Sequence, residues 1–237
     1  MIRAHVRRAA TLLGLLAVWP ALAAQVRPAP EFTPPSLPAN GATVESLVPT
    51  GWIIEQRHQA DFNRDGRPDV LLVLRQAGTE DTAPRRIVLV ALATTRPQGY
   101  VLFDANARLI PSDSSGQFED PLTNGEITVR PGGFDLRLSM MSGIGSYLTA
   151  TMRYRFRFER SCFRLIGYDR YETHRATLDT HDLSVNFLTG SVTSTAGNAQ
   201  SNRTQTQRSQ LVSNTRRCLS DVPNGWTFDP LTATPHP

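Results

Sequence analysis

The sequence contains no lysine and has little net charge. All 25 basic residues among its 237 are arginine, against 21 acidic residues. Three arginines (Arg3, Arg7 and Arg8) lie in the amino-terminal segment, so the rest of the chain carries 22 arginines and a net charge of 22 − 21 = +1. Proteins that bind nucleic acid usually carry a clear basic surplus. We therefore expect no nucleic-acid partner.

Long apolar runs are missing beyond the amino terminus. Residues 1–8 are basic, residues 9–19 are apolar, and Ala21-Leu22-Ala23 offers the small-x-small pattern that signal peptidase recognises. The apolar run is shorter than the roughly 20 residues that span a bilayer. We predict a signal peptide over residues 1–23, and hence an exported protein, periplasmic or secreted, with no transmembrane segment.

Cysteine is scarce, because Cys162 and Cys218 are the only two. In an oxidising compartment, two cysteines with no others in the chain most simply form a disulfide with each other. Closing the 56-residue separation would stabilise the fold by about 4 kcal/mol in the chain-entropy account. Two free thiols, one of them catalytic, are the alternative, although no Cys-His signature surrounds either residue.

Convincing helical periodicity is also lacking. Residues 24–41 contain five prolines and predict an extended linker. Residues 42–192 predict a β-domain, because short apolar or alternating runs are separated by turn residues. Short helices at 104–110 or 205–217 are the helical possibilities. The predicted strands cover residues 52–58, 69–75, 86–92, 100–103, 127–130, 134–140, 148–159, 163–168 and 183–188.

The clearest strand pattern lies in residues 148–159. Apolar side chains alternate with polar ones over 11 residues, which predicts one buried and one solvated face. Turn residues at 131–133 and 159–161 predict hairpins. We predict a mainly β fold: an antiparallel sheet, curled or sandwich-like, with little helix. Residues 193–237 predict a polar loop, mobile to about residue 215, and a tail tied back by Cys218.

The most specific motif is the stretch Asp61-Phe62-Asn63-Arg64-Asp65-Gly66-Arg67-Pro68-Asp69. Oxygen-bearing side chains at loop positions 1, 3, 5 and 9, with a turn glycine at position 6, are typical of a calcium loop. Position 12 is Leu72, where an EF-hand needs glutamate, and the flanks predict strands. The alternative is a metal-free turn in which these side chains cap their own backbone.

This motif resembles the calcium loop of FG-GAP and VCBS-type repeats. The resemblance implies a loop between two antiparallel strands and a Ca²⁺ ion. Its implied ligands are Asp61, Asn63, Asp65, the Arg67 carbonyl and Asp69. A single copy of the loop cannot build a multi-blade propeller. Residues 154–158, 163–169 and 184–190 more loosely resemble uncharacterised exported proteins of Gram-negative bacteria.

Catalytic motifs are not recognisable. Residues 142–146 do not form the nucleophile elbow Gly-x-Ser-x-Gly, and a Ser-His-Asp set using His174 or His181 with Asp179 or Asp182 has no supporting signature. A stripe of Arg153, Arg155 and Arg157 predicts either an anion-binding patch or a solvated face paired with acids such as Asp135 and Glu159.

These features favour an exported, calcium-stabilised β-domain that acts as a non-catalytic binding or envelope-associated module. An envelope glycan or a protein would be its partner. A secreted or periplasmic hydrolase with an unrecognised site is one alternative, because its site could lie in loops without a motif. A protein-protein interaction domain that uses residues 193–215 is another.

Overall fold

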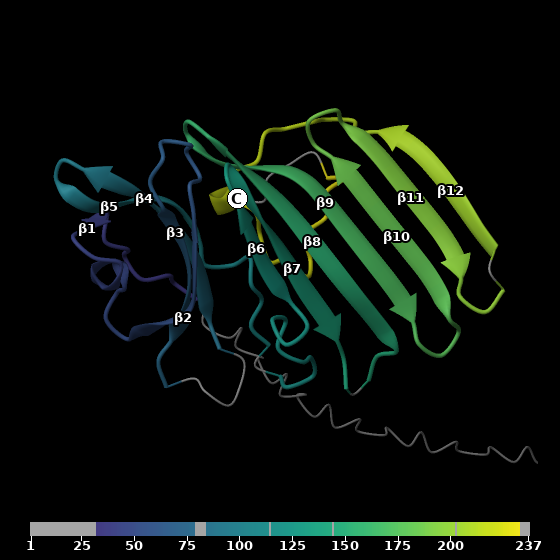
Figure 1. Ribbon diagram of the computed structural model, residues 1–237. Coiled ribbons are helices and arrows are strands. Elements are labelled where there is room, and N and C mark those ends of the chain that lie inside the picture. Colours follow the sequence, from purple (N-terminus) through teal and green to yellow (C-terminus); the bar gives the residue numbers. More distant parts are fainter. Residues whose placement is uncertain (1–31, 79–83, 114, 144, 202, 233–237) are drawn as a thin grey trace, which may run out of the picture. The chain divides into compact units, whose positions relative to one another are not determined.

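The computed structural model describes residues 32–78, 84–113, 115–143, 145–201 and 203–232. The predicted signal peptide and the first part of the predicted linker lie outside these residues. From Pro34 onward the chain belongs to one unit. In the described residues this unit contains two antiparallel sheets, of five and seven strands (Figure 1). The prediction of a mainly β, sandwich-like fold is therefore confirmed, and the fold is not a propeller.

Sequential strands are neighbours in both sheets, except that β1 pairs with β5 and not with β2. The five-stranded sheet has the order β1-β5-β4-β3-β2 and contains β1 (Asn40–Gly41), β2 (Trp52–Ala60), β3 (Asp69–Gln76), β4 (Arg86–Thr95) and β5 (Gln98–Asn106). The seven-stranded sheet follows chain order and contains β6 (Glu126–Arg130), β7 (Gly133–Met141), β8 (Leu148–Glu159), β9 (Cys162–His174), β10 (Asp179–Asn186), β11 (Ser191–Asn198) and β12 (Arg203–Gln210). Two single-turn 3-10 helices, η1 (Glu45–Leu47) and η2 (Leu219–Asp221), are the helical elements of the described chain.

The five-stranded sheet is covered on both faces, which explains its continuous apolar runs. Leu71 and Val73 of β3 face the core shared with the seven-stranded sheet. Leu72 and Leu74 face a second cluster, which Leu47 of η1 closes. A strand buried on both faces has no polar face to show, so its sequence reads as an uninterrupted apolar run.

The seven-stranded sheet is covered on one face, from β6 to the parts of β10 and β11 that carry the buried Val185 and Val192. The apolar side chains of β8 (Ala150, Met152, Tyr154 and Phe156) are buried, while Arg153 and Arg157 on its other face are exposed. The predicted hairpins are present as β6–β7 and β8–β9. A register irregularity after Arg155 shifts the pairing with β9 by one residue.

The prediction of a polar loop over residues 193–215 is wrong. The described part of this segment contributes to β11 and β12, which pair in an eight-residue antiparallel register. Both strands are rich in threonine, a β-branched residue that favours strands. All of β12 is exposed, so backbone pairing, and not apolar burial, holds it in the sheet. The predicted helix at 205–217 is wrong for the same reason.

Two smaller predictions also need correction. The predicted helix at 104–110 is wrong, since β5 continues through Asn106. The linker predicted to reach residue 41 ends earlier, because Asn40 and Gly41 pair with Val101 and Tyr100 of β5.

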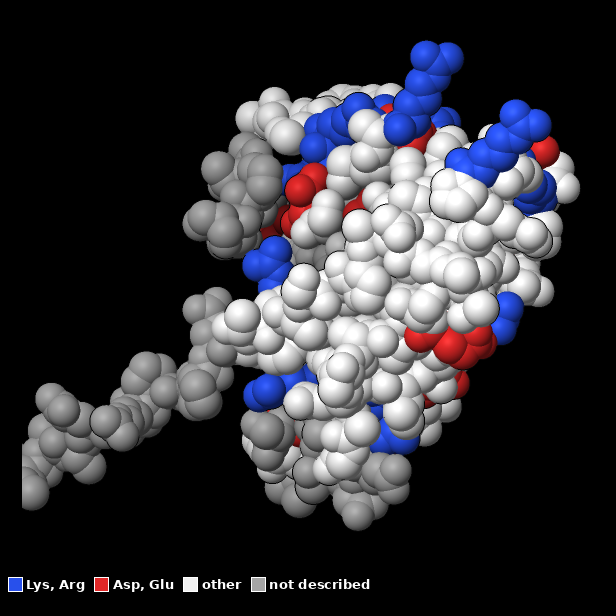
Figure 2. All heavy atoms as spheres, turned by 90° about the vertical axis from the view of Figure 1, so that its left-hand side faces the viewer, with Lys and Arg blue, Asp and Glu red and all other residues white. Residues whose placement is uncertain are grey.

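Among the described residues, none of the helices has the length and apolar character that crossing a bilayer requires. On the side that carries β1 and β5, Figure 2 shows mainly uncharged side chains, with basic and acidic ones in small separate groups.

Candidate functional site

The acidic loop joins β2 to β3 and turns through two left-handed residues. Arg64 has φ 62° and Gly66 has φ 84°. A Cβ at Gly66 would meet no atom within 4 Å, so the dihedral angle, and not lack of space, favours glycine there. The predicted strand-loop-strand arrangement is present.

The side chains at loop positions 1, 3 and 5 fold inward onto the same backbone. The Asp65 amide donates to Asp61 Oδ1 and to Asn63 Oδ1, both at 3.0 Å. The Gly66 amide donates to Asp61 Oδ2 at 2.9 Å, and Asn63 Nδ2 donates to Asp65 Oδ2 at 2.8 Å. Desolvation raises the pKa of Asp65, but hydrogen bonds from Asn63 and Arg67 outweigh it and lower that pKa, so the carboxylate is ionised.

Asp69 lies beneath the loop and is fully buried. Its Oδ2 accepts hydrogen bonds from the amides of Phe62 at 2.9 Å and Asn63 at 3.3 Å, and its Oδ1 accepts one from Ala93 of β4 at 2.8 Å. Desolvation raises the pKa of Asp69 in spite of these bonds. This carboxylate therefore braces the loop against β4, and its role as a calcium ligand stays a prediction.

The donor set of the loop suits a hard cation. Asp61, Asn63 and Asp65 supply carboxylate and amide oxygens, the ligand type that calcium prefers. The amide of Arg67 donates to Asp65 Oδ1, and its guanidinium forms an ion pair with the same carboxylate. Within the part of the chain that the structure describes, no three His, Cys, Asp or Glu side chains are grouped to hold a metal. The loop therefore brings together two carboxylates and one side-chain amide.

The loop also lies where the two sheets meet. Phe62 is fully buried and packs edge-on against Phe163 of β9, with ring centroids 5.3 Å apart. The Gly132 amide, in the β6–β7 turn, donates to the Asp61 carbonyl at 3.2 Å. A Cβ at Gly132 would lie 3.1 Å from Arg64 Nε, so the Arg64 side chain crosses this glycine. The conformation of the loop is thus coupled to the junction of the sheets.

Within the predicted anion patch, each arginine of the β8 stripe has an acidic partner. Arg153 pairs with Asp135 at 2.5 Å, Arg155 with Asp169 at 2.9 Å, and Arg157 with Glu159 at 2.9 Å. A Cβ at Gly167 would lie 2.4 Å from Arg155 Nε, so this position leaves room for the guanidinium. The stripe is therefore an ion-paired face along most of its length.

Of the histidines and aspartates that the sequence analysis considered without a supporting signature, His174 and Asp179 both contact Thr177 Oγ1, at 2.9 and 2.6 Å, whereas His181 and Asp182 are not brought together. His181 and Asp182 are neighbours on β10, so their side chains point to opposite faces of the sheet. His181 instead contacts Ser194 Oγ through Nε2 at 3.2 Å, and its Nδ1 lies 3.9 Å from Glu172 Oε2. The sequence analysis missed both partners, which register alone brings together.

This Ser-His-Glu arrangement lacks what acyl transfer needs. β11 lies between β10 and β12, so amides along it donate alternately to its two neighbours. In this part of the described chain, those amides are not available to form an oxyanion hole beside Ser194. The arrangement therefore gives no support for hydrolysis.

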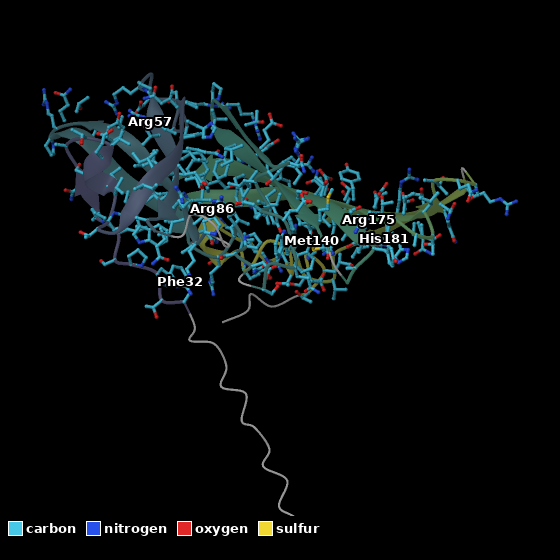
Figure 3. The ribbon with its side chains drawn as sticks, turned by 90° about the horizontal axis from the view of Figure 1, so that it is seen from below. Phe32, Arg57, Arg86, Met140, Arg175 and His181 are labelled. Carbon is cyan, nitrogen blue, oxygen red and sulfur yellow. A yellow bond between two sulfur atoms is a disulfide. The ribbon has the colours of Figure 1, made fainter. Side chains whose placement is uncertain are left out.

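A cleft of about 1010 Å³ opens between the five-stranded sheet and the segment after β5. Apolar lining comes from Ile53, Phe118 and Trp226, with proline side chains beside them. The sequence analysis missed this cleft, because its lining comes from segments as far apart as Ile53 and Trp226. Figure 3 shows Arg86, part of the lining, and His181 at separate places in the molecule.

Arg86 forms the charged floor of the cleft and is only 4% exposed. Its guanidinium makes a two-point contact with Glu55 at 2.5 and 2.9 Å and another with Asp120 at 2.7 and 3.1 Å. Desolvation would lower the pKa of Arg86, but the hydrogen bonds to both carboxylates raise it. Arg86 therefore ties β2, β4 and the segment after β5 together.

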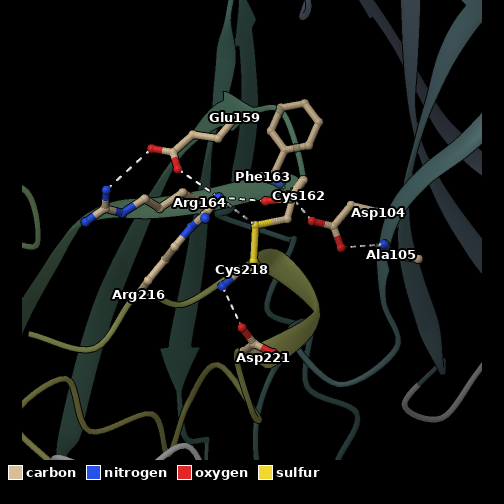
Figure 4. Close-up of a disulfide and its surroundings, with 10 residues drawn as sticks. Asp104, Ala105, Glu159, Cys162, Phe163, Arg164, Arg216, Cys218 and Asp221 are labelled. Carbon is tan, nitrogen blue, oxygen red and sulfur yellow. Dashed lines mark hydrogen bonds and ion pairs between the residues drawn. A yellow bond between two sulfur atoms is a disulfide. The ribbon is translucent and has the colours of Figure 1, made fainter.

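The predicted disulfide between Cys162 and Cys218 is confirmed, with a Cα–Cα separation of 5.7 Å. It ties β9 to the residue that precedes η2. Beside it, the buried Asp104 carboxylate accepts hydrogen bonds from the amides of Phe163 and Ala105 at 2.8 and 3.0 Å (Figure 4). The disulfide and Asp104 together join the tail and β5 to the seven-stranded sheet.

No protein-family model, curated protein or solved structure matches this chain.

Proposed function

We propose that this chain is an exported, periplasmic or secreted β-domain that calcium stabilises and that acts as a non-catalytic binding module. The observation that carries the calcium role is the placement of the acidic loop. The side chains of Asp61 and Asn63 both accept a hydrogen bond from the Asp65 amide, while Phe62 and Asp69 anchor the loop in the interior.

In this proposal Asp61, Asn63, Asp65, the carbonyl of Arg67 and Asp69 hold the ion. The ion neutralises two carboxylates that otherwise repel each other across a tight turn. A cation that binds the folded loop and not the unfolded chain adds its binding free energy to the stability of the fold. Because the loop contacts the β6–β7 turn, that stabilisation would reach both sheets.

The cleft is the proposed binding site. It is concave, as ligand sites are, and its lining mixes apolar side chains with charged and polar ones such as Arg75, Glu119 and Asp120. Phe118 and Trp226 pack together with ring centroids 5.1 Å apart and give the cleft an aromatic wall. An envelope glycan or a segment of a partner protein would contact this wall.

Isothermal titration of Ca²⁺ into the chelator-treated protein tests the calcium role. We expect one site per chain, lost in Asp61→Asn and in Asp65→Asn. Asp113→Asn is the matched control, because Asp113 also caps its own loop through Ser115 and Phe118 but is outside the motif. Wild-type protein that binds no calcium, or Asp61→Asn protein that binds it normally, would refute the assignment.

A further inference from the structure

Three arginines converge on one carboxylate at the end of the β8–β9 hairpin. Arg157 Nη2 lies 2.9 Å from Glu159 Oε1, and Arg164 Nη1 lies 3.4 Å from the same oxygen. Arg216 Nη2 lies 2.9 Å from Glu159 Oε2. Figure 4 shows Arg164 and Arg216 on either side of Glu159. We name these four residues the Glu159 cluster.

The Glu159 cluster has a larger surplus of positive charge than the rest of the β8 stripe, where Arg153 shares Asp135 with Arg130 (2 − 1 = +1) and Arg155 pairs with Asp169. Both of these aspartates are buried. Within the described residues, the ion pairs of the three cluster arginines all go to Glu159, so the cluster carries 3 − 1 = +2. The side chains of Arg157 and Arg216 are 44% and 48% exposed, whereas that of Glu159 is 22% exposed. The positive charge is therefore accessible to a ligand.

The fold holds these arginines in place from three directions. Arg157 and Arg164 face each other across β8 and β9. Arg216 comes from the tail, where the Cys162–Cys218 disulfide and a β-bridge between Arg164 and Cys218 fix the backbone. Arg216 also donates to Ser161 Oγ at 2.8 Å, which places a hydroxyl beside the guanidinium.

We propose that the Glu159 cluster binds a phosphate group. Guanidinium groups offer paired N–H donors that match the oxygens of a tetrahedral dianion, and a charge of +2 is neutralised by one phosphate dianion. The group belongs either to free phosphate or to the headgroup of an envelope lipid. This inference goes beyond the proposed binding role, because the Glu159 cluster is not part of the cleft, and it is tested without calcium so that this proposal and the calcium proposal can fail separately.

Isothermal titration of inorganic phosphate into the oxidised, calcium-free protein tests the proposal. Charge-assisted hydrogen bonds of this kind are worth roughly 10-fold or more in affinity, so Arg157→Gln and Arg216→Gln should each weaken phosphate binding about 10-fold. Arg153→Gln is the matched control, since it removes an arginine of the same strand whose partner is Asp135. It should leave the affinity within about 2-fold.

Glu159→Gln gives the opposite and more diagnostic result. Removing the carboxylate raises the cluster charge to +3, and phosphate binding should tighten several-fold. Reduction of the disulfide should weaken binding, because Arg216 then loses its tether. A cluster that is only structural would show no gain in Glu159→Gln.

Vesicles of neutral phospholipid with and without phosphatidate identify the source of the phosphate. Binding to phosphatidate vesicles that is lost in Arg216→Gln supports a lipid headgroup, while phosphate binding without vesicle binding supports a free phosphate ligand. Circular dichroism of each variant confirms that it is folded. Wild-type protein that binds no phosphate, or folded Arg157→Gln and Arg216→Gln proteins that both bind it normally, would overturn the proposal.

Discussion

The two ends of the fold are held together in different ways. β3 and β4 of the five-stranded sheet are buried on both faces, with apolar clusters on each side. β12, at the edge of the seven-stranded sheet, is exposed along its whole length and polar throughout. Burial stabilises the first region, whereas backbone hydrogen bonds to β11 hold the second. Substitutions should therefore act on stability in the first region and on local opening in the second.

The largest effect should come from opening the disulfide that ties the tail to β9. The double substitution Cys162→Ser and Cys218→Ser releases a 56-residue loop and should lower the free energy of unfolding by about 4 kcal/mol. Urea denaturation of oxidised, reduced and substituted protein measures this directly. Equal midpoints for the oxidised and substituted proteins would show that the bond contributes nothing.

The buried sheet should respond strongly to a cavity. Leu72→Ala removes a fully buried side chain of β3 and should cost about 3 kcal/mol. Gln207→Ala, in exposed β12, should change the free energy of unfolding by less than about 0.5 kcal/mol. Similar losses from the two substitutions would contradict the contrast between the regions.

Asp104 makes stability depend on pH at the junction of the sheets. Desolvation raises its pKa although the Phe163 and Ala105 amides oppose this. A carboxyl whose pKa is higher in the folded than in the unfolded state stabilises the fold when it is protonated. Its contribution to the free energy of unfolding is complete below the unfolded-state pKa and is lost as the pH rises through the folded-state pKa. Asp104→Asn should remove this component, so the unfolding free energy of the variant should fall less steeply with rising pH than that of the wild type. Unfolding free energies of both proteins from about pH 4 to about pH 7 measure it, and identical slopes would rule it out.

The smallest effect concerns single hydrogen bonds of the polar edge. The Leu211 amide donates to the Gly190 carbonyl, and hydrogen-bonded pairs alternate along the β11–β12 register. The amide of Gln207 therefore points to β11, and that of Thr206 points away. Gln207→Pro should cost about 1 kcal/mol and speed amide exchange in β11, and Thr206→Pro should do so far less. Equal exchange in both variants would contradict this register.

The sequence predicts the buried parts of the fold best. The alternation in β8 and the apolar runs of β3 and β4 reflect which faces are covered, and burial acts directly on side-chain choice. β11 and β12 escaped prediction because backbone pairing imposes no apolar pattern on an exposed strand. Threonine content was the available signal.

The candidate sites also differ in how well the sequence predicts them. The acidic loop is local in sequence, so its spacing alone predicts a strand-loop-strand turn with inward-facing oxygens. The cleft and the Glu159 cluster draw on residues that are far apart in the chain, such as Ile53 with Trp226 and Arg157 with Arg216. Their assembly depends on sheet register and on the disulfide, which no local pattern encodes.

The most direct test of the central claim is the melting temperature of the protein without residues 1–23 in excess chelator, in millimolar Ca²⁺ and in millimolar Mg²⁺. A ligand that binds one site of the folded protein and is present at about 100 times its dissociation constant raises the free energy of unfolding by about 2.7 kcal/mol. We predict a rise of several degrees with Ca²⁺, little change with Mg²⁺, and no calcium response in Asp65→Ala. The same melting temperature in chelator and in Ca²⁺ would contradict a calcium-stabilised fold and leave the loop as a metal-free turn.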